Sequence, residues 1–121
     1  MGIDVIEVER VKSAIEKHGE RFLRRIFTER EIDYCSRRKK PYQSFAGRFS
    51  AKEAVMKAIG TGLSSGIRWK DIEILNDEKG RPYVILHGKA REMVNNRKVD
   101  ISISHSDTCA AAVCIIYGQG E

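Results

Sequence analysis

Two charged side chains interrupt the apolar stripe of a helix predicted over residues 41–59. Pro41 suits the first position of this helix, and Gly60 suits the position after its end. At about 100° per residue, Lys52 falls in the middle of the stripe and Glu53 on its edge. The apolar members of the stripe are Phe45, Phe49, Met56 and Ile59. Because Lys and Glu are almost never buried without a partner, the helix either packs against polar groups there or borders a cleft.

A second carboxylate comes from a distant segment. Asp4 lies between Ile3 and Val5 in a predicted strand, where a carboxylate is at least half buried. Asp4 and Glu53 could together hold a hard cation such as Mg²⁺, which uses few carboxylates and fills its other positions with water and substrate phosphate. The alternatives are an exposed strand face or a helix N-cap for Asp4, and an ordinary i,i+4 salt bridge to Lys57 for Glu53.

A glycine-rich loop follows the helix. Residues 60–66, with the sequence GTGLSSG, offer small side chains and free backbone N–H groups. Such loops can approach phosphates closely, so Gly60, Thr61 and Gly62 are candidate phosphate-binding residues. The loop matches neither a P-loop nor a dinucleotide-binding motif, and the alternative is a helix C-cap with a flexible connection.

The segment SISHSD, residues 102–107, contains the residue types of a Ser–His–Asp hydrolase. Neighbouring residues on a strand point to opposite faces, so these adjacent residues cannot form a proton relay. His105 alone, at the end of a predicted strand, is a candidate site residue. Together with Lys57 and the arginines, it suits a phosphate-bearing substrate.

The elements that must position these residues change in type along the chain. Helices dominate the first half and strands the second, so we expect an α+β fold with N-terminal helices packed on a mostly antiparallel β-sheet. The length of 121 residues suits a single domain, 1–121. Thr28 and Glu31 have the spacing of a capping box. The predicted strands are 2–6, 71–75 paired with 83–86, and 99–104 paired with 109–117, and the other predicted helices are 7–19, 28–38 and 88–96.

The formal net charge of +5 is unevenly distributed. Residues 21–52 hold ten Lys or Arg and three Asp or Glu. This segment is either a solvated basic face or a landing surface for a polyanion. The RRKK run at 37–40 leaves a basic nucleic-acid-binding module without catalysis as an alternative, although aromatic residues do not interleave with basic ones as in base-stacking surfaces. A protein that binds nucleotide without catalysis is the other alternative, and the family resemblance described below implies that it would be a trimer.

Neither the apolar runs nor the cysteines indicate a membrane or secreted protein. No apolar run approaches the ~20 residues that cross a bilayer, and the acidic start MGIDVIEVER is unlike a signal peptide. We therefore expect a cytoplasmic protein that does not bind membranes. The three cysteines lack C-x-x-C spacing, which argues against a disulfide framework or a zinc site. Cys109 and Cys114 are expected to be small buried side chains.

Three segments taken together resemble one known family. GIDVIEVER, GRFSAKEAVMKAIGTG and ISISHSDTCAAA are similar to the signature regions of holo-acyl-carrier-protein synthase, the short class of 4′-phosphopantetheinyl transferases. Their order and spacing match from Gly2 to about Tyr117. The resemblance implies that a serine of an apo acyl carrier protein attacks the β-phosphate of coenzyme A. The products are the holo carrier, used in fatty acid biosynthesis, and adenosine 3′,5′-bisphosphate.

The resemblance also implies roles for particular residues. Asp4 and Glu53 match Mg²⁺ ligands, and Lys57 matches a lysine that contacts the phosphates, so Lys52 and Glu53 are expected to point at metal and pyrophosphate. The residues that match contacts to coenzyme A are Arg48 and His105, and those that match contacts to the acidic carrier are Arg10, Arg21, Phe22 and Arg25. The family forms homotrimers with active sites between subunits, and the basic segment 21–52 gains an acidic protein, not nucleic acid, as its partner.

Overall fold

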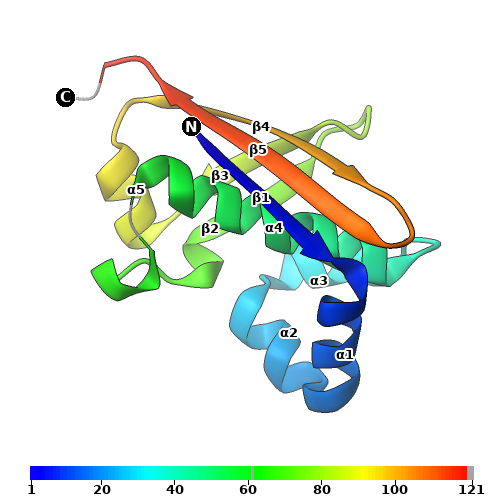
Figure 1. Cartoon of the computed structure of the whole chain (residues 1–121). Helices are drawn as coiled ribbons and strands as arrows, with labels where there is room; N and C mark the ends of the chain where they lie inside the picture. The colour runs from blue at the N-terminus through cyan, green and yellow to red at the C-terminus, as the bar shows by residue number, and fades with distance from the viewer. Residues whose placement is uncertain (61, 120–121) are drawn as a thin grey trace.

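Helix α4 (Pro41–Ile59) runs beneath a three-stranded antiparallel sheet (Figure 1). Three shorter helices from the first part of the chain gather near its start, and another short helix lies near its end. The structure, a computed structural model, describes residues 1–60 and 62–119, apart from the side chain of residue 64. The strands are β1 (Gly2–Glu7), β2 (Ile72–Asn76), β3 (Pro82–Leu86), β4 (Lys98–His105) and β5 (Cys109–Tyr117). The other helices are α1 (Val8–His18), α2 (Glu20–Ile26), α3 (Glu29–Ser36) and α5 (Gly88–Val94), with 3₁₀ turns η1 (Leu63–Ser65) and η2 (Trp69–Asp71). The predicted α+β class is confirmed.

The predicted strand pairs are present, but the described strands form two sheets. Strands β2 and β3 pair as the expected hairpin and make a sheet of their own. Strand β4 pairs with β5 as expected, and β1 pairs with the other side of β5. The register aligns Asp4 with Ala112 and Ala112 with Ile103. Strands β1 and β4 are therefore the two edges of one sheet, about 10 Å apart.

Helix α2 was not predicted from the sequence. It has seven residues and is separated from α1 only by Gly19. Gly19 has φ 56°, a conformation that strains other side chains, and this lets the chain turn abruptly between the two helices. A helix this short has too few turns to give a clear apolar period.

Close packing of β1 on α4 depends on Gly2. A Cβ added to Gly2 would lie 2.0 Å from the carbonyl oxygen of Ala54 and 2.7 Å from the backbone nitrogen of Ala58. Only glycine therefore lets the start of β1 lie against the α4 backbone. This close approach positions Asp4, two residues later, beside the C-terminal half of α4.

The charge in the middle of the α4 stripe faces the core. Lys52 is fully buried, and its Nζ lies 2.8 Å from Glu31 Oε1 and donates to the carbonyl oxygens of Trp69 and Ile72. Glu31 also accepts a hydrogen bond from the Thr28 backbone N–H, in the predicted capping box. The prediction that Lys52 points at metal and pyrophosphate is wrong, because Glu31 and two carbonyl oxygens satisfy its ammonium group inside the core.

The cysteines are all free. Cys114 is buried as predicted, but the prediction for Cys109 is wrong because its side chain is exposed. Cys109 is the first residue of β5, next to the turn from β4, where few side chains cover it.

Candidate active site

Asp4, Glu53 and Lys57 come together where β1 lies against α4. Asp4 alternates along β1 with exposed Ile3 and Val5, so its side chain turns toward the helix and is 14% exposed. Lys57 Nζ lies 3.0 Å from Asp4 Oδ1 and donates a 3.1 Å hydrogen bond to the Ile3 carbonyl oxygen. Glu53 is half-buried one turn earlier on α4. The structure thus brings three predicted residues from two distant segments together.

Two cavities meet at Glu53. The first, which we call the acidic cavity, has a volume of about 380 Å³, and its lining includes Asp4, Ile6, Arg10, Phe22, Phe49 and Glu53. The second, which we call the glycine-loop cavity, has a volume of about 470 Å³ and is lined by Glu53, Met56, Lys57, Gly60, Gly62 and Leu63. Gly60 ends α4 with φ 93°. Thr61, also predicted here, lies outside the described residues.

The charges around the two carboxylates favour a cation. Burial raises the pKa of Glu53, and the Asp4 carboxylate raises it further, whereas Lys57 lowers it. A divalent ion between two half-buried carboxylates would relieve their repulsion. Asp4 and Glu53 fit Mg²⁺, which commonly binds one or two carboxylates plus water and phosphate. Within residues 1–60 and 62–119, no group of three or more His, Cys, Asp or Glu could hold a metal.

Arg48 and His105 line a different cavity, of about 370 Å³, which we call the basic cavity. Arg48 is 5% exposed, lies 4.3 Å above the Tyr34 ring and donates through Nη2 to Asn76 Oδ1. In the part of the chain that the structure describes, nothing accepts a hydrogen bond from Arg48 Nε. Three further cations line the cavity, namely Arg38, Lys39 and Lys40. A buried guanidinium with an unused donor among other cations suits an anionic ligand.

The acidic and basic cavities lie at opposite edges of the sheet. Asp4 is on edge strand β1, and His105 is the last residue of the other edge strand, β4. Arg48 and Glu53 are five residues apart on α4, so their side chains point roughly 140° apart. Within one chain, the structure does not bring Arg48 and His105 into the cavities that Glu53 lines.

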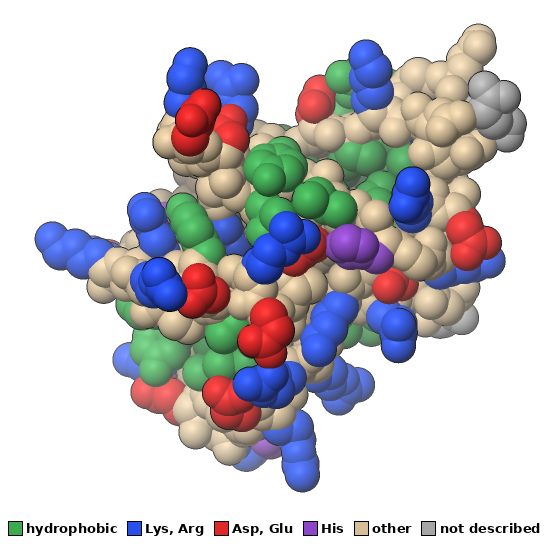
Figure 2. Space-filling view, turned by 180° about the vertical axis from the view of Figure 1, so that it is seen from behind, with side chains coloured by type: hydrophobic (Ala, Val, Ile, Leu, Met, Phe, Trp, Pro, Cys, Tyr) green, Lys and Arg blue, Asp and Glu red, His purple; other side chains and the backbone are tan. Residues whose placement is uncertain are grey.

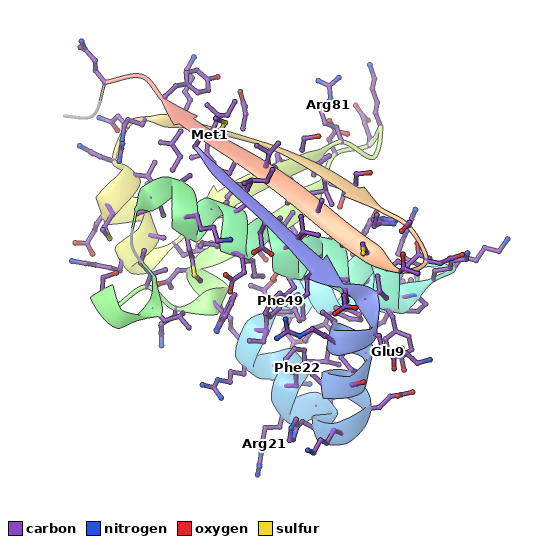
Figure 3. The ribbon with its side chains drawn as sticks, viewed as in Figure 1. Met1, Glu9, Arg21, Phe22, Phe49 and Arg81 are labelled. Carbon is purple, nitrogen blue, oxygen red and sulfur yellow. The ribbon has the colours of Figure 1, made fainter. Side chains whose placement is uncertain are left out.

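The predicted carrier-binding residues fall into two groups. Arg10 of α1 and Phe22 of α2 line the acidic cavity. Figure 3 shows Phe22 between α1 and α2, and Phe49 between α4 and α2. Arg21 and Arg25 are exposed on α2 and are not among the described lining residues of that cavity. Arg21 lies at the end of the helical group that is far from the sheet (Figure 3).

Basic side chains are spread over the surface and mixed with acidic ones. Figure 2 shows Lys and Arg across one face with Asp and Glu between them. Several of these cations are paired, for example Arg24 with Glu20 and Arg37 with Asp33. Among the described residues, no ion pair involves Arg10, Arg21 or Arg25.

Sequence reasoning missed most of the basic cavity. The RRKK run was a signal for Lys39 and Lys40, but it was interpreted as part of a surface for nucleic acid or an acidic protein and was not connected with Arg48 and His105. Asn76, at the end of β2, carries no local signal at all. It meets Arg48, 28 residues earlier, only because the hairpin packs against α4.

None of the described helices is both long enough and apolar enough to span a membrane.

Sequence comparison finds close relatives along almost the whole chain. The profile of the 4′-phosphopantetheinyl transferase superfamily matches residues 1–114. A holo-[acyl-carrier-protein] synthase of Protochlamydia amoebophila is 50% identical over 115 residues, which cover 95% of this chain and 94% of that protein. A protein of the same name from Koribacter versatilis is 43% identical over 118 residues, which cover 95% of this chain and 94% of that protein.

Solved structures agree with these sequence relationships. The Helicobacter pylori holo-[acyl-carrier-protein] synthase in complex with coenzyme A has a TM-score of 0.85 at 29% identity and covers 96% of this chain and 98% of that chain. The Bacillus anthracis protein of that name, in complex with CoA (3′,5′-ADP), has a TM-score of 0.78 at 36% identity and covers 95% and 92%. The α+β fold is therefore shared with proteins that bind coenzyme A.

Proposed function

The chain belongs to the 4′-phosphopantetheinyl transferase superfamily and, within it, to the holo-acyl-carrier-protein synthases, and from this premise we propose how its residues divide the reaction. The enzyme transfers the 4′-phosphopantetheine arm of coenzyme A to a serine of apo acyl carrier protein. The serine oxygen forms a bond to the β-phosphorus, and the serine proton is lost. The bond from that phosphorus to the bridging oxygen breaks, which releases adenosine 3′,5′-bisphosphate.

The transfer takes place where the acidic and glycine-loop cavities meet. The observation that carries this assignment is that Asp4 and Glu53 line one cavity while Lys57 contacts Asp4. Phosphoryl-type transfer depends mainly on positioning and charge neutralisation. Mg²⁺ held by the two carboxylates would polarise the pyrophosphate. Lys57 adds an ammonium group. Gly60 and Gly62 let phosphate oxygens approach the backbone. Thr61 is assigned to the same phosphate-binding loop from the sequence alone.

The metal assignment is tested by chelation. We expect EDTA to stop the transfer and Mg²⁺ to restore it, because without a cation the two carboxylates would repel the pyrophosphate and Lys57 offsets only one of their charges. The measurement is the initial rate of carrier modification at a series of Mg²⁺ concentrations. A rate that chelation does not change would contradict the metal site and leave the family assignment intact.

The nucleotide of coenzyme A binds in the basic cavity. Arg48 and His105 line it, and the Arg48 guanidinium, with Arg38 and the two lysines, gives it the positive charge that a phosphate requires. This cavity and the carboxylates lie at opposite edges of the sheet, so we propose that each coenzyme A spans two subunits. One subunit supplies Asp4, Glu53 and Lys57, and its neighbour supplies Arg48 and His105.

A homotrimer with active sites at the subunit interfaces joins the two half-sites. The sheet face that points away from α4 supports this assembly. It exposes four apolar side chains of β1 and β5, namely Ile3, Val5, Ile115 and Tyr117. Uncovered apolar faces of this kind commonly mark protein interfaces.

Subunit mixing tests this shared site. Glu53→Gln disables one half-site, and His105→Glu disables the other by putting a negative charge in the basic cavity. In trimers assembled from equal amounts of the two variants, about one interface in four joins two intact halves. We expect the mixture to regain activity that neither variant has alone. A mixture as inactive as its components, at equal trimer content by sedimentation, would contradict the shared site.

The carrier binds over α1 and α2. Arg10 lines the acidic cavity, and Arg21 and Arg25 are exposed and form no ion pair among the described residues, so they are available to an acidic protein. Arg10→Glu should raise the KM for the carrier roughly tenfold, because like charges then face each other at the rim. The KM for coenzyme A should stay within error. Added salt should weaken carrier binding by wild type, since exposed charges are screened over ~8–10 Å. A carrier KM unchanged by both would contradict the binding of the carrier beside Arg10.

The comparisons favour the transferase over the nucleic-acid-binding alternative, because the relatives carry the name of an enzyme. We propose that the enzyme works in the cytoplasm. Free cysteines, which this chain has at all three positions, are typical of a reducing compartment.

A further inference from the structure

One glutamine connects two side chains at the edge of the basic cavity. Gln43 Oε1 lies 3.1 Å from His105 Nδ1, and Gln43 Nε2 donates a 2.7 Å hydrogen bond to Asp107 Oδ1. Lys40 Nζ lies 2.9 Å from the same Asp107 oxygen. Gln43 and His105 both line the basic cavity, whereas Asp107 lies outside its described lining.

The partners of Gln43 fix the orientation of its amide. An ionised carboxylate only accepts hydrogen bonds, so the amide NH₂ group must face Asp107. The amide oxygen must then face His105. Lys40 and Gln43 hold the pKa of Asp107 below its usual range, which keeps this carboxyl ionised.

The fixed amide in turn fixes the histidine ring. An amide oxygen can only accept, so His105 Nδ1 must carry a proton. Nε2 is then the ring nitrogen that remains for a ligand, and in the described part of the chain it makes no hydrogen bond. When the ring is protonated, Nε2–H can donate to an anion beside Arg48 and the cavity's lysines.

We propose that Gln43, held by Asp107, is a positioning residue that accepts a hydrogen bond from His105 Nδ1–H and so directs the Nε2–H of the charged ring to a phosphate of coenzyme A. This inference rests on the proposed binding of the nucleotide in the basic cavity. Gln43 does not touch the reacting phosphorus, so its effect should fall on the binding of coenzyme A.

Imidazole nitrogen NMR tests the proposal in the full-length protein without coenzyme A. The chain has three histidines, and a His105→Asn spectrum identifies the signals of His105. At a pH where the ring is neutral, wild type should show the Nδ1–H tautomer. Gln43→Met keeps a similar side-chain length but removes the acceptor, so the ring should shift toward Nε2–H.

Steady-state kinetics supply the second readout. Gln43→Met should raise the KM for coenzyme A about two- to tenfold, the range that one net hydrogen bond contributes. Tyr42→Phe, one residue earlier on α4, is the matched control and should leave both the tautomer and this KM as in wild type.

The proposal requires both changes in Gln43→Met, and either one without the other overturns it. The variants also separate this inference from the proposed nucleotide site. If His105→Asn leaves the KM for coenzyme A unchanged, the nucleotide site itself is wrong. If His105→Asn raises this KM and Gln43→Met does not, only the role of Gln43 is rejected.

Discussion

Lys57 Nζ lies 3.0 Å from Asp4 Oδ1, which joins the last turns of α4 to the first strand of the chain. The Lys57 side chain is 52% exposed and that of Asp4 is 14% exposed. Lys57 lines the glycine-loop cavity and Asp4 lines the acidic cavity, so the pair lies between the two cavities and not in the core. A phosphate that enters this cavity meets an ammonium group that β1 already holds in position.

Replacement of this lysine should affect the chemical step. Lys57→Ala removes the positive charge that offsets charge on the leaving group, so kcat should fall on the order of 10²–10³-fold. The KM for the carrier should change little, because the carrier binds over α1 and α2. Lys70→Ala, an exposed lysine of η2, is the control and should behave as wild type. If Lys57→Ala raised only the carrier KM at full kcat, Lys57 would be a docking residue.

Gly2→Ala should move β1 away from α4. Both atoms that the new Cβ would strike belong to the α4 backbone, which cannot give way as a side chain can. We expect a loss of about 1–3 kcal/mol in the free energy of unfolding. We also expect a higher Mg²⁺ concentration at half-maximal rate, because Asp4 shifts with the strand.

Gly47→Ala is the comparison for this variant. Its Cβ would meet side chains, Ile103 at 3.1 Å and His105 at 3.4 Å, so the loss of stability should be smaller and the Mg²⁺ requirement unchanged. Urea unfolding and Mg²⁺ titration measure both effects. A Gly2→Ala enzyme with wild-type stability and Mg²⁺ requirement would refute the positioning of Asp4 by Gly2.

Lys52 should matter for folding and not for transfer. Lys52→Met leaves Glu31 as an unpaired buried charge, which typically costs about 3–5 kcal/mol. Lys52→Met combined with Glu31→Gln should recover part of this loss, because the glutamine is uncharged and its oxygen can still accept from one of the two backbone N–H groups that Glu31 binds. Urea unfolding gives the two free energies. Equal stability of the single variant and wild type would show that the ion pair contributes nothing.

Acid stability should depend on Glu73. Burial alone would raise the pKa of Glu73, but hydrogen bonds from Arg30, Thr28 and His87 hold it below its usual value of 4.5, at about 2. The unfolded chain therefore binds the proton first, and the stabilisation present above pH 4.5 is lost as the pH falls toward 2. Glu73→Gln should reduce the fall in unfolding free energy over this window by on the order of 1–3 kcal/mol.

The control for Glu73 is an exposed acid. Glu78→Gln, in the β2–β3 loop, should not change the fall in the free energy of unfolding at acidic pH. Thermal unfolding at a series of pH values compares the three proteins. Parallel curves for wild type and Glu73→Gln would contradict the lowered pKa.

The sequence carried enough information to bring the two carboxylates together. The alternation of side chains along residues 2–6 predicted that Asp4 points inward. The helical period predicted that Glu53 lies at the edge of the apolar stripe of α4. Both signals are local, and a strand packed on a helix preserves them. The predicted hairpin and the Thr28 capping box were confirmed for the same reason.

Predictions that depended on distant partners failed or were missed. The helical period located Lys52 in the stripe, but nothing local identified Glu31 as its partner, so Lys52 was assigned to the wrong side of the helix. Arg48 and Asn76 meet only after the hairpin packs on α4. Strands β1 and β5 likewise pair although they are far apart in the sequence. No turn connects them, so no local sequence signal predicts their pairing.

The most direct test of the central claim is the mass of an apo acyl carrier protein after incubation with this enzyme, coenzyme A and Mg²⁺. Wild type should add the mass of one phosphopantetheine arm to the carrier. Glu53→Gln, which keeps the side-chain volume but removes the charge, should add almost none at saturating Mg²⁺. A folded wild-type enzyme that leaves the carrier mass unchanged would contradict the transfer itself. A wild-type rate in Glu53→Gln would contradict the site at which we propose it takes place.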